Sequence, residues 1–271
     1  MALKIISLNT WGGRIHKPLI DFVSKGEADI YCFQEVYSKR EPRTEPQTVQ
    51  DEQGLDVHFD LFSDLEAALP NHHGYFCPAV QGYLHDRAEA PLPVFYGIAT
   101  FVRKSIPVIN SVTHFVYREF RPDVFGEPPL PRNAHAIRVY DYEAKSELVL
   151  IHLHGLYQKN DKIDTPQRNI QASNLLGLAE GMTERMEEKI VICGDFNLLP
   201  NSSTHELLAQ QLDMTELVTS RGFTDTRTSL YQKPIRYADY TFVTPQVNVI
   251  EFDVLVEPEV SDHRALQLIC T

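Results

Sequence analysis

The chain has 271 residues, and 43% of them are hydrophobic, enough to build the core of one large domain or two ordinary ones. Its formal net charge of −12 disfavours broad binding of polyanions through a basic surface. This charge does not exclude a nuclease, because a bound divalent cation supplies positive charge where a phosphate lies. We expect no signal peptide and no membrane insertion, since no stretch has the required apolar pattern.

Short apolar segments with strand character recur between polar loops along the whole chain. We expect strands at residues 3–9, 29–35, 96–103, 135–142, 147–154, 189–195, 238–243, 247–251 and 264–269. Three stretches lack a regular pattern and are expected to be loops, at residues 37–58, 78–95 and 116–134.

Helices are fewer than strands. One is expected after Pro18, with apolar residues at helical spacing and Gly26 as its stop signal. A second is expected to begin with Thr165 as N-cap and to continue its apolar period to Met186. Many strands with interspersed helices predict an α/β protein in which two packed sheets are flanked by helices.

The four cysteines are scattered, without the spacing of a zinc site or a redox motif. Three lie in apolar strand-like runs, so we expect buried, reduced thiols. Reduced thiols fit a reducing compartment, and we expect a cytoplasmic protein.

Polar residues with catalytic potential follow two of the expected strands. Asp195 and Asn197 are two residues apart on extended backbone, so their side chains project to the same side. Asp262 and His263 are adjacent, so both reach one site only if the chain bends there. A carboxylate, a carboxamide and an imidazole gathered in this way suit metal-assisted attack of water on phosphorus.

Six sequence blocks occur in an order typical of one protein family: LNTW, FQEV, HLHG, GDFN, RYADYTFV and SDHRAL, between residue 3 and about residue 268. With these blocks the chain resembles the endonuclease/exonuclease/phosphatase superfamily. The resemblance implies one catalytic domain over residues 1–271. It also implies a deoxyribonuclease-I-like fold, a four-layer α/β sandwich of two packed mixed β-sheets flanked by helices. The chemistry implied is hydrolysis of a phosphoester bond with Mg²⁺ or Mn²⁺.

The metal ligands implied by the resemblance are oxygen donors. Glu35 ends the second strand and is expected to be the main ligand, since a hard cation prefers carboxylate oxygen. Asn9 and Asp262 are expected to assist it. The alternatives are a solvated carboxylate for Glu35 and a turn cap for Asn9.

The catalytic residues implied by the resemblance surround the phosphate. Asp195 is expected to orient and deprotonate the attacking water, and Asn197 to bind a phosphoryl oxygen. Asp239 matches the family residue that accepts a hydrogen bond from His263 and thereby raises the pKa of this imidazole. The resulting imidazolium is expected to stabilise charge in the transition state.

The HLHG block holds two histidines on one strand face. The family usually has Asn-Thr-His here, and aligning the last position places His154 in the site, bonded to phosphate. His152 then takes the place of the Asn, and the alternative assignment exchanges the two roles. Arg168 and Gln171 are expected to support the loop after His154.

Substrate contacts are less well defined by the sequence. Tyr96 stands where several family nucleases place a residue near the phosphate, and packing is the equal alternative. Arg132 is a candidate phosphate contact, with a solvated charge as its alternative. Together with Arg118 and Arg121 it forms a group of arginines expected to contact phosphates beyond the scissile one. The only tryptophan, Trp11, is assigned to packing.

Three functions are compatible with these features. The first, preferred on analogy with the fold family alone, is a nuclease-type phosphodiesterase that acts on DNA or RNA, although no long basic run supports it. The second is a phosphatase or phosphodiesterase for a lipid headgroup or a small phosphorylated metabolite. The third, an inactive binding module, is disfavoured because no candidate catalytic residue type is missing. The expected partner is a phosphoester substrate, nucleic acid included, and the expected assembly is a monomer.

Overall fold

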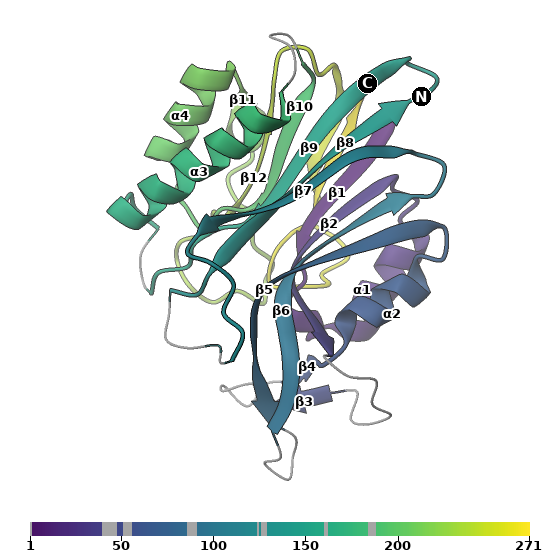
Figure 1. The fold of residues 1–271 in the computed structure, drawn as a ribbon, viewed down its shortest axis with the longest axis vertical. Coiled ribbons are helices and arrows are strands. Elements are labelled where there is room, and N and C mark those ends of the chain that lie inside the picture. Colours follow the sequence, from purple (N-terminus) through teal and green to yellow (C-terminus); the bar gives the residue numbers. More distant parts are fainter. Residues whose placement is uncertain are drawn as a thin grey trace.

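The computed structural model describes residues 2–39, 48–50, 56–85, 91–123, 125, 129–159, 162–183 and 188–271. Two β-sheets pack face to face, and helices cover both outer faces (Figure 1). The predicted four-layer α/β sandwich is therefore confirmed. None of the helices in these ranges is long and apolar enough to span a membrane.

The first sheet has eight strands. In spatial order they are β13 (Val249–Val254), β14 (Leu266–Cys270), β1 (Leu3–Asn9), β2 (Ile30–Lys39), β6 (Pro91–Arg103), β5 (His72–His85), β3 (Thr48–Gln50) and β4 (Asp56–His58). Only β1 and β2 pair in parallel within it, and β1 pairs antiparallel with β14 on its other side. The helices α1 (His16–Lys25) and α2 (Leu61–Ala68) pack Leu19 and Leu61 against Ile6 and Leu8 of β1. A short 3₁₀ helix, η1 (Trp11–Gly13), follows β1.

The second sheet has six strands. Their spatial order is β11 (Thr215–Glu216), β12 (Asp239–Val243), β10 (Ile190–Asp195), β9 (Ser146–His154), β8 (Arg132–Asp141) and β7 (Val108–Tyr117). Here β9 and β10 are the parallel pair. The helices α3 (Pro166–Met182) and α4 (Ser203–Leu212) cover its outer face (Figure 1), and the short α5 (Leu217–Ser220) follows β11.

The position of the polar residues follows from these two parallel pairs. Leu3 and Ile5 of β1 and Cys32 of β2 join the core shared with β9 and β10. Side chains alternate along a strand, so Asn9 shares the inward face of Leu3 and Ile5. The ends of β1, β9 and β10 and the middle of β2 therefore gather polar side chains beside the core between the sheets.

Several boundaries differ from the sequence predictions. Residues 78–95 were expected to be a loop, but β5 continues to His85 and β6 begins at Pro91. Pro91 and Pro93 are unusual residues in a strand. They lie beyond Val94, the last residue of β6 that pairs with β2. The N–H groups that proline lacks are therefore not needed for hydrogen bonds between β6 and β2. Arg132 begins β8 three residues earlier than expected.

Some elements gave no sequence signal. The edge strand β7 exposes most of its side chains, so apolar and polar residues do not alternate along it. Its neighbour in the sequence, the predicted loop 116–134, contains the end of β7 and the start of β8. The short strands β3 and β4 lie within the expected loop 37–58.

The helix predictions are confirmed with shifted ends. α1 begins at His16, and Pro18 is tolerated because it lies in the first turn. Thr165 caps α3, where its side chain accepts a hydrogen bond from the Arg168 N–H. This helix ends at Met182, and Met186 lies outside the described residues. All four cysteines are buried and free, as predicted.

Candidate active site

A cleft of about 450 Å³ opens where β1, β9 and β10 end, beside the middle of β2. Eight of the ten residues selected from the sequence line it: Glu35, Tyr96, Arg132, His154, Asp195, Asn197, Asp262 and His263. The other two, Asn9 and Asp239, bond directly to residues of the cleft. The structure therefore brings all ten together.

Glu35 reaches the cleft through a β-bulge. Phe33 of β2 pairs with Ala99 and Val36 pairs with Gly97, so β2 carries one extra residue at this point. Phe33 and Val36 both pack on the outer side under α1 and α2. Regular alternation would send Glu35 to the same outer side as Phe33. Instead Glu35 has φ +57°, and its side chain turns inward to Asn9.

The Asn9 amide connects the two sheets. Its Nδ2 donates to Oε1 of Glu35 at 3.1 Å and to Oδ2 of Asp195 at 3.0 Å. The Nε2 atom of His154 lies 3.9 Å from Glu35 Oε1 and 3.8 Å from Asp195 Oδ2. Asn9, His154 and Asp195 end β1, β9 and β10. Glu35 was expected to end its strand, but it lies within β2, which continues to Lys39. Together these side chains form the floor of the cleft.

Electrostatics at this floor are unfavourable for the free protein. Burial raises the pKa of Glu35 to about 7, and the carboxylates of Asp262 and Asp195 add to the effect, which outweighs the Asn9 hydrogen bond. Burial and Arg132 hold the pKa of His154 well below its usual value, so this imidazole is neutral. A neutral imidazole gives the neighbouring carboxylates no compensating charge.

The segment after β10 holds Asn197 in place. Asn197 has φ +54°, and its N–H donates to Asp195 Oδ1 at 2.8 Å. Arg168 donates to the Asn197 carbonyl at 3.2 Å, and Gln171 accepts from the Leu156 N–H at 2.7 Å. The expected support of the loop after His154 by α3 is thus present.

His263 is bonded on both ring nitrogens. Its Nδ1 lies 2.9 Å from both carboxylate oxygens of Asp239, as the resemblance implies. Its Nε2 faces Nη1 of Arg227, which can only donate. The ring is therefore neutral, with its proton on Nδ1. Burial and Arg227 lower the pKa of His263 to about 3, so the expected rise of this pKa and the expected imidazolium are wrong for the free protein.

The residues at Glu35 fit a hard cation. Asp262 binds Arg227 through Oδ2 at 2.9 Å, but its buried Oδ1 has no hydrogen-bond partner among the described residues. The unpaired Oδ1 of Asp262 and the carboxylate of Glu35, whose pKa is raised, are oxygen donors of the kind that Mg²⁺ or Mn²⁺ prefers. Potential ligand atoms of Asp195, Asp239 and His263 also lie within 4.8 Å of one another. Asp239 and His263 already bond to each other, however, which makes them poorer candidates for a metal site.

Several cations of the cleft were missed by the sequence analysis. Besides Arg132, the lining includes Arg14, Lys162, Arg227 and Lys233. They come from separate segments, so no basic run marks them in the sequence. Burial and Arg227 lower the pKa of Lys162 to about 8, which still leaves it mostly charged near neutral pH.

Aromatic side chains line the cleft beside these cations. Arg14 stacks on Trp11 at 4.7 Å, and Arg227 stacks on Tyr231 at 4.2 Å. Trp11, which was assigned to packing, packs against Arg14 and also lines the cleft.

The expected group of three arginines is not one cluster around the site. Arg118 and Arg121 line a separate pocket and bond to the carbonyls of Pro129 and Phe125. Arg132 is 5% exposed, which excludes a solvated charge, and its Nε donates to the Gly155 carbonyl. Tyr96 is buried beside His154, with its ring centre 6.2 Å from the imidazole.

The two histidines of β9 lie at different depths. His152 lies between the sheets, 1% exposed, with Nδ1 3.4 Å from Thr100 Oγ1. Burial lowers the pKa of His152 to about 3. Only His154 lines the cleft.

Comparison with known proteins agrees with this geometry. The model of the endonuclease/exonuclease/phosphatase family matches residues 6–263. The chain belongs to this family. Its members are hydrolases that act on phosphoester bonds. No curated protein sequence matches the chain.

Solved structures of this family share the fold at low sequence identity. A mannosyl-6-phosphatase of Bacteroides thetaiotaomicron is 16% identical, with a TM-score of 0.68 and 99% of each chain covered. The human Nocturnin catalytic domain with bound sulfate is 18% identical, with a TM-score of 0.67 over 100% of this chain and 93% of that chain. D. rerio TDP2 in complex with single-stranded DNA product is 14% identical, with a TM-score of 0.61 over 100% and 99%.

Replacing Glu35 by Gln should stabilise the metal-free protein. The pKa of Glu35 in the folded protein, about 7, exceeds its ordinary value of 4.5, so ionised Glu35 costs stability above pH 7 and almost nothing below pH 4.5. We expect Glu35→Gln to raise the free energy of unfolding by up to about 3 kcal/mol at pH 8, and by little at pH 5. Urea denaturation in EDTA measures both values. Equal stability of the two proteins at pH 8 would contradict the unfavourable charge.

The depths of the two histidines predict different effects of substitution. His154→Ala should lower kcat on the order of 100-fold, because the side chain lies at the floor of the cleft. His152→Ala should leave kcat within a few fold and instead lower the free energy of unfolding by about 2 kcal/mol. Steady-state kinetics and urea denaturation of both variants separate these effects. The reverse pattern would assign catalysis to His152.

Proposed function

We propose that this protein is a Mg²⁺- or Mn²⁺-dependent hydrolase that cleaves a phosphoester bond of a compact, phosphorylated substrate. The observation that carries this proposal is the arrangement at the floor of the cleft. A cation at this floor would pair with the free Oδ1 of Asp262 and relieve the unfavourable charge of Glu35. Asp195 is held next to Glu35 by the shared hydrogen bonds from Asn9.

The metal ligands in this proposal are Glu35 and Asp262, with Asn9 orienting Glu35 through its hydrogen bond. A bound divalent cation would neutralise charge on the phosphoryl oxygens. The Asp262 Oδ2–Arg227 ion pair leaves Oδ1 for this purpose.

Asp195 is placed to take the proton of the attacking water. Asn9 holds its Oδ2 and the Asn197 N–H holds its Oδ1, so the carboxylate cannot rotate freely. A fixed orientation aligns one lone pair with a water opposite the leaving group, as in-line attack requires. The position of His263, 3.7 Å from Asp195 Oδ2, limits this water to the remaining open side.

Several hydrogen-bond donors around this position are placed to bind the phosphoryl oxygens of a substrate. In our proposal these donors are the Asn197 amide, His154, Arg132 and the pair of His263 with Asp239. The Nη1 atom of Arg132 is buried and has no partner in the described part of the chain. Arg227 supplies the positive charge that neutral His263 lacks, because its guanidinium touches both His263 and Asp262.

A compact substrate is favoured by the distribution of charge. The chain is acidic overall, and five cations converge on this one cleft: Arg14, Arg132, Lys162, Arg227 and Lys233. Such a site attracts a molecule whose anionic groups all fit within it. The structural likeness to a mannosyl-6-phosphatase is consistent with this class of substrate.

A nuclease-type phosphodiesterase is the second candidate. Trp11, Tyr157 and Tyr231 line the cleft and offer faces on which a base can stack. D. rerio TDP2, which shares the fold, is described in complex with single-stranded DNA product. Arg118 and Arg121 no longer support this candidate, because they lie outside the cleft.

A hydrolysis panel tests the proposal and separates the candidates. Sugar phosphates, nucleotides, inositol phosphates, sphingomyelin, single-stranded and duplex DNA, and RNA are incubated with protein and Mg²⁺ or Mn²⁺. We expect turnover of a small phosphate ester that is lost in EDTA, restored by Mg²⁺, and reduced at least 100-fold in Glu35→Gln. Turnover that is undiminished in EDTA would refute metal dependence, and turnover of polynucleotides alone would select the nuclease.

The cations of the cleft predict a difference between two double variants. Arg14→Gln with Lys233→Gln should raise KM about 10-fold for a substrate with a second phosphate, and much less for a substrate with one phosphate. Arg118→Gln with Arg121→Gln removes the same charge outside the cleft and serves as the matched control. Equal changes of KM in both double variants would mean that net charge, and not the cleft, governs binding.

A further inference from the structure

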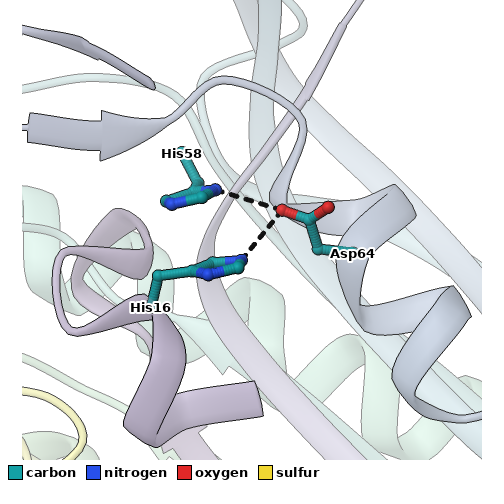
Figure 2. A group of neighbouring side chains, drawn as sticks. All are labelled: His16, His58 and Asp64. Carbon is teal, nitrogen blue, oxygen red and sulfur yellow. Dashed lines mark hydrogen bonds and ion pairs between the residues drawn. The ribbon is translucent and has the colours of Figure 1, made fainter. Parts of the chain in front are cut away.

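A second cluster of ligand-type side chains lies away from the catalytic residues. His16 begins α1, His58 ends β4, and Asp64 lies in the first turn of α2 (Figure 2). None of the three lines the catalytic cleft. They therefore form a separate site, which we call the outer histidine cluster.

The cluster converges on one carboxylate oxygen. His16 Nε2 lies 3.0 Å and His58 Nδ1 lies 3.1 Å from the same atom, Asp64 Oδ2. The two rings stack with centroids 3.4 Å apart and an interplanar angle of 6°. Figure 2 shows both rings directed at the carboxylate from one side. The ligand atoms of all three residues lie within 4.8 Å of one another.

Hydrogen bonds satisfy this arrangement in the free protein, because one carboxylate oxygen can accept from both imidazoles. The same convergence of two ring nitrogens and a carboxylate oxygen also suits a metal ion. Partial burial raises the pKa of Asp64, but the hydrogen bonds from His16 and His58 outweigh it and hold this pKa well below its usual range. The carboxylate is thus charged and able to act as a ligand.

One divalent ion can take the place of the two N–H protons that point at this oxygen. Two imidazole nitrogens and a carboxylate oxygen are ligands typical of Zn²⁺, at about 2.0–2.2 Å from the ion. Ligand atoms at such distances and tetrahedral angles lie about 3.4 Å apart, close to the N–O distances of 3.0 and 3.1 Å found here. The His16 side chain, 29% exposed, has room to tilt so that the two lone pairs converge.

We propose that the outer histidine cluster binds a Zn²⁺-class transition-metal ion through His16, His58 and Asp64. Water completes the coordination, because Asp64 is 41% exposed and leaves the outer side of the ion open. The hard-oxygen site at Glu35 selects a different class of metal, so the two sites are chemically distinct.

The position of the cluster gives the ion a structural role. It joins α1 to β4 and α2, which follow one another about thirty residues further along the chain. His58 also packs against the turn of η1, where a side chain at Gly13 would meet its Cβ at 3.2 Å. Since η1 carries Trp11 of the cleft, the ion stabilises one wall of the catalytic cleft from behind.

Binding of Zn²⁺ and Co²⁺ to the full chain tests this proposal. The protein is first stripped with chelator and then titrated. We expect Zn²⁺ to raise Tm by roughly 5 °C, and Co²⁺ to give the intense visible absorption of a tetrahedral nitrogen-ligated ion. Both signals should persist in Glu35→Gln, which weakens only the catalytic site, and both should be lost in His16→Gln and in Asp64→Asn.

A matched control uses His73→Gln, which replaces an exposed histidine of β5 outside the cluster. This variant should bind both metals like the unaltered protein. Equal Tm shifts in His16→Gln and the unaltered protein would overturn the proposal. Loss of the Co²⁺ absorption in Glu35→Gln alone would overturn it as well. Neither readout depends on hydrolysis, so failure here is distinguishable from failure of the proposed function.

Discussion

The amide of Asn9 is the interaction on which the site depends. Its single nitrogen donates to Glu35 of one sheet and to Asp195 of the other, at 3.1 and 3.0 Å. Two carboxylates that repel each other are thereby held at a fixed separation across the interface between the sheets. Everything else in the cleft is placed relative to them, because His154 and His263 both lie within 4 Å of Asp195.

Much of the local backbone is shaped to maintain this contact. Trp11, Glu35 and Asn197 each adopt positive φ, which costs free energy for residues with a side chain. Trp11 and Asn197 follow closely on β1 and β10, and Glu35 lies at the bulge within β2, where regular alternation would turn its side chain away from the cleft. The strained backbone and the uncompensated charge of Glu35 therefore occur together at the cleft. Burial of the large core between the two sheets offsets the free-energy cost of both.

The sequence was sufficient for the fold and for selecting ten residues that the structure gathers at one cleft, because eight of them stand in sequence blocks with a recognisable pattern. It failed for Arg227, Lys162 and Arg14, which belong to separate loops and converge only in the folded chain. It also misjudged His263, whose charge state depends on the contact with Arg227, a residue thirty-six positions away. The edge strand β7 escaped prediction because its exposure removes the apolar alternation on which strand prediction relies.

The interior position of β14 has a consequence for the order in which the sheet can form. β14 lies between β13 and β1, so Leu3 is opposite Cys270 in the eight-stranded sheet, and Figure 1 shows the two ends of the chain side by side. During translation, β1 keeps one edge unpaired until residues 266–270 have left the ribosome. Asp262 and His263, which line the cleft, lie just before this strand. One late segment of the chain therefore supplies both the second neighbour of β1 and the last lining residues of the cleft.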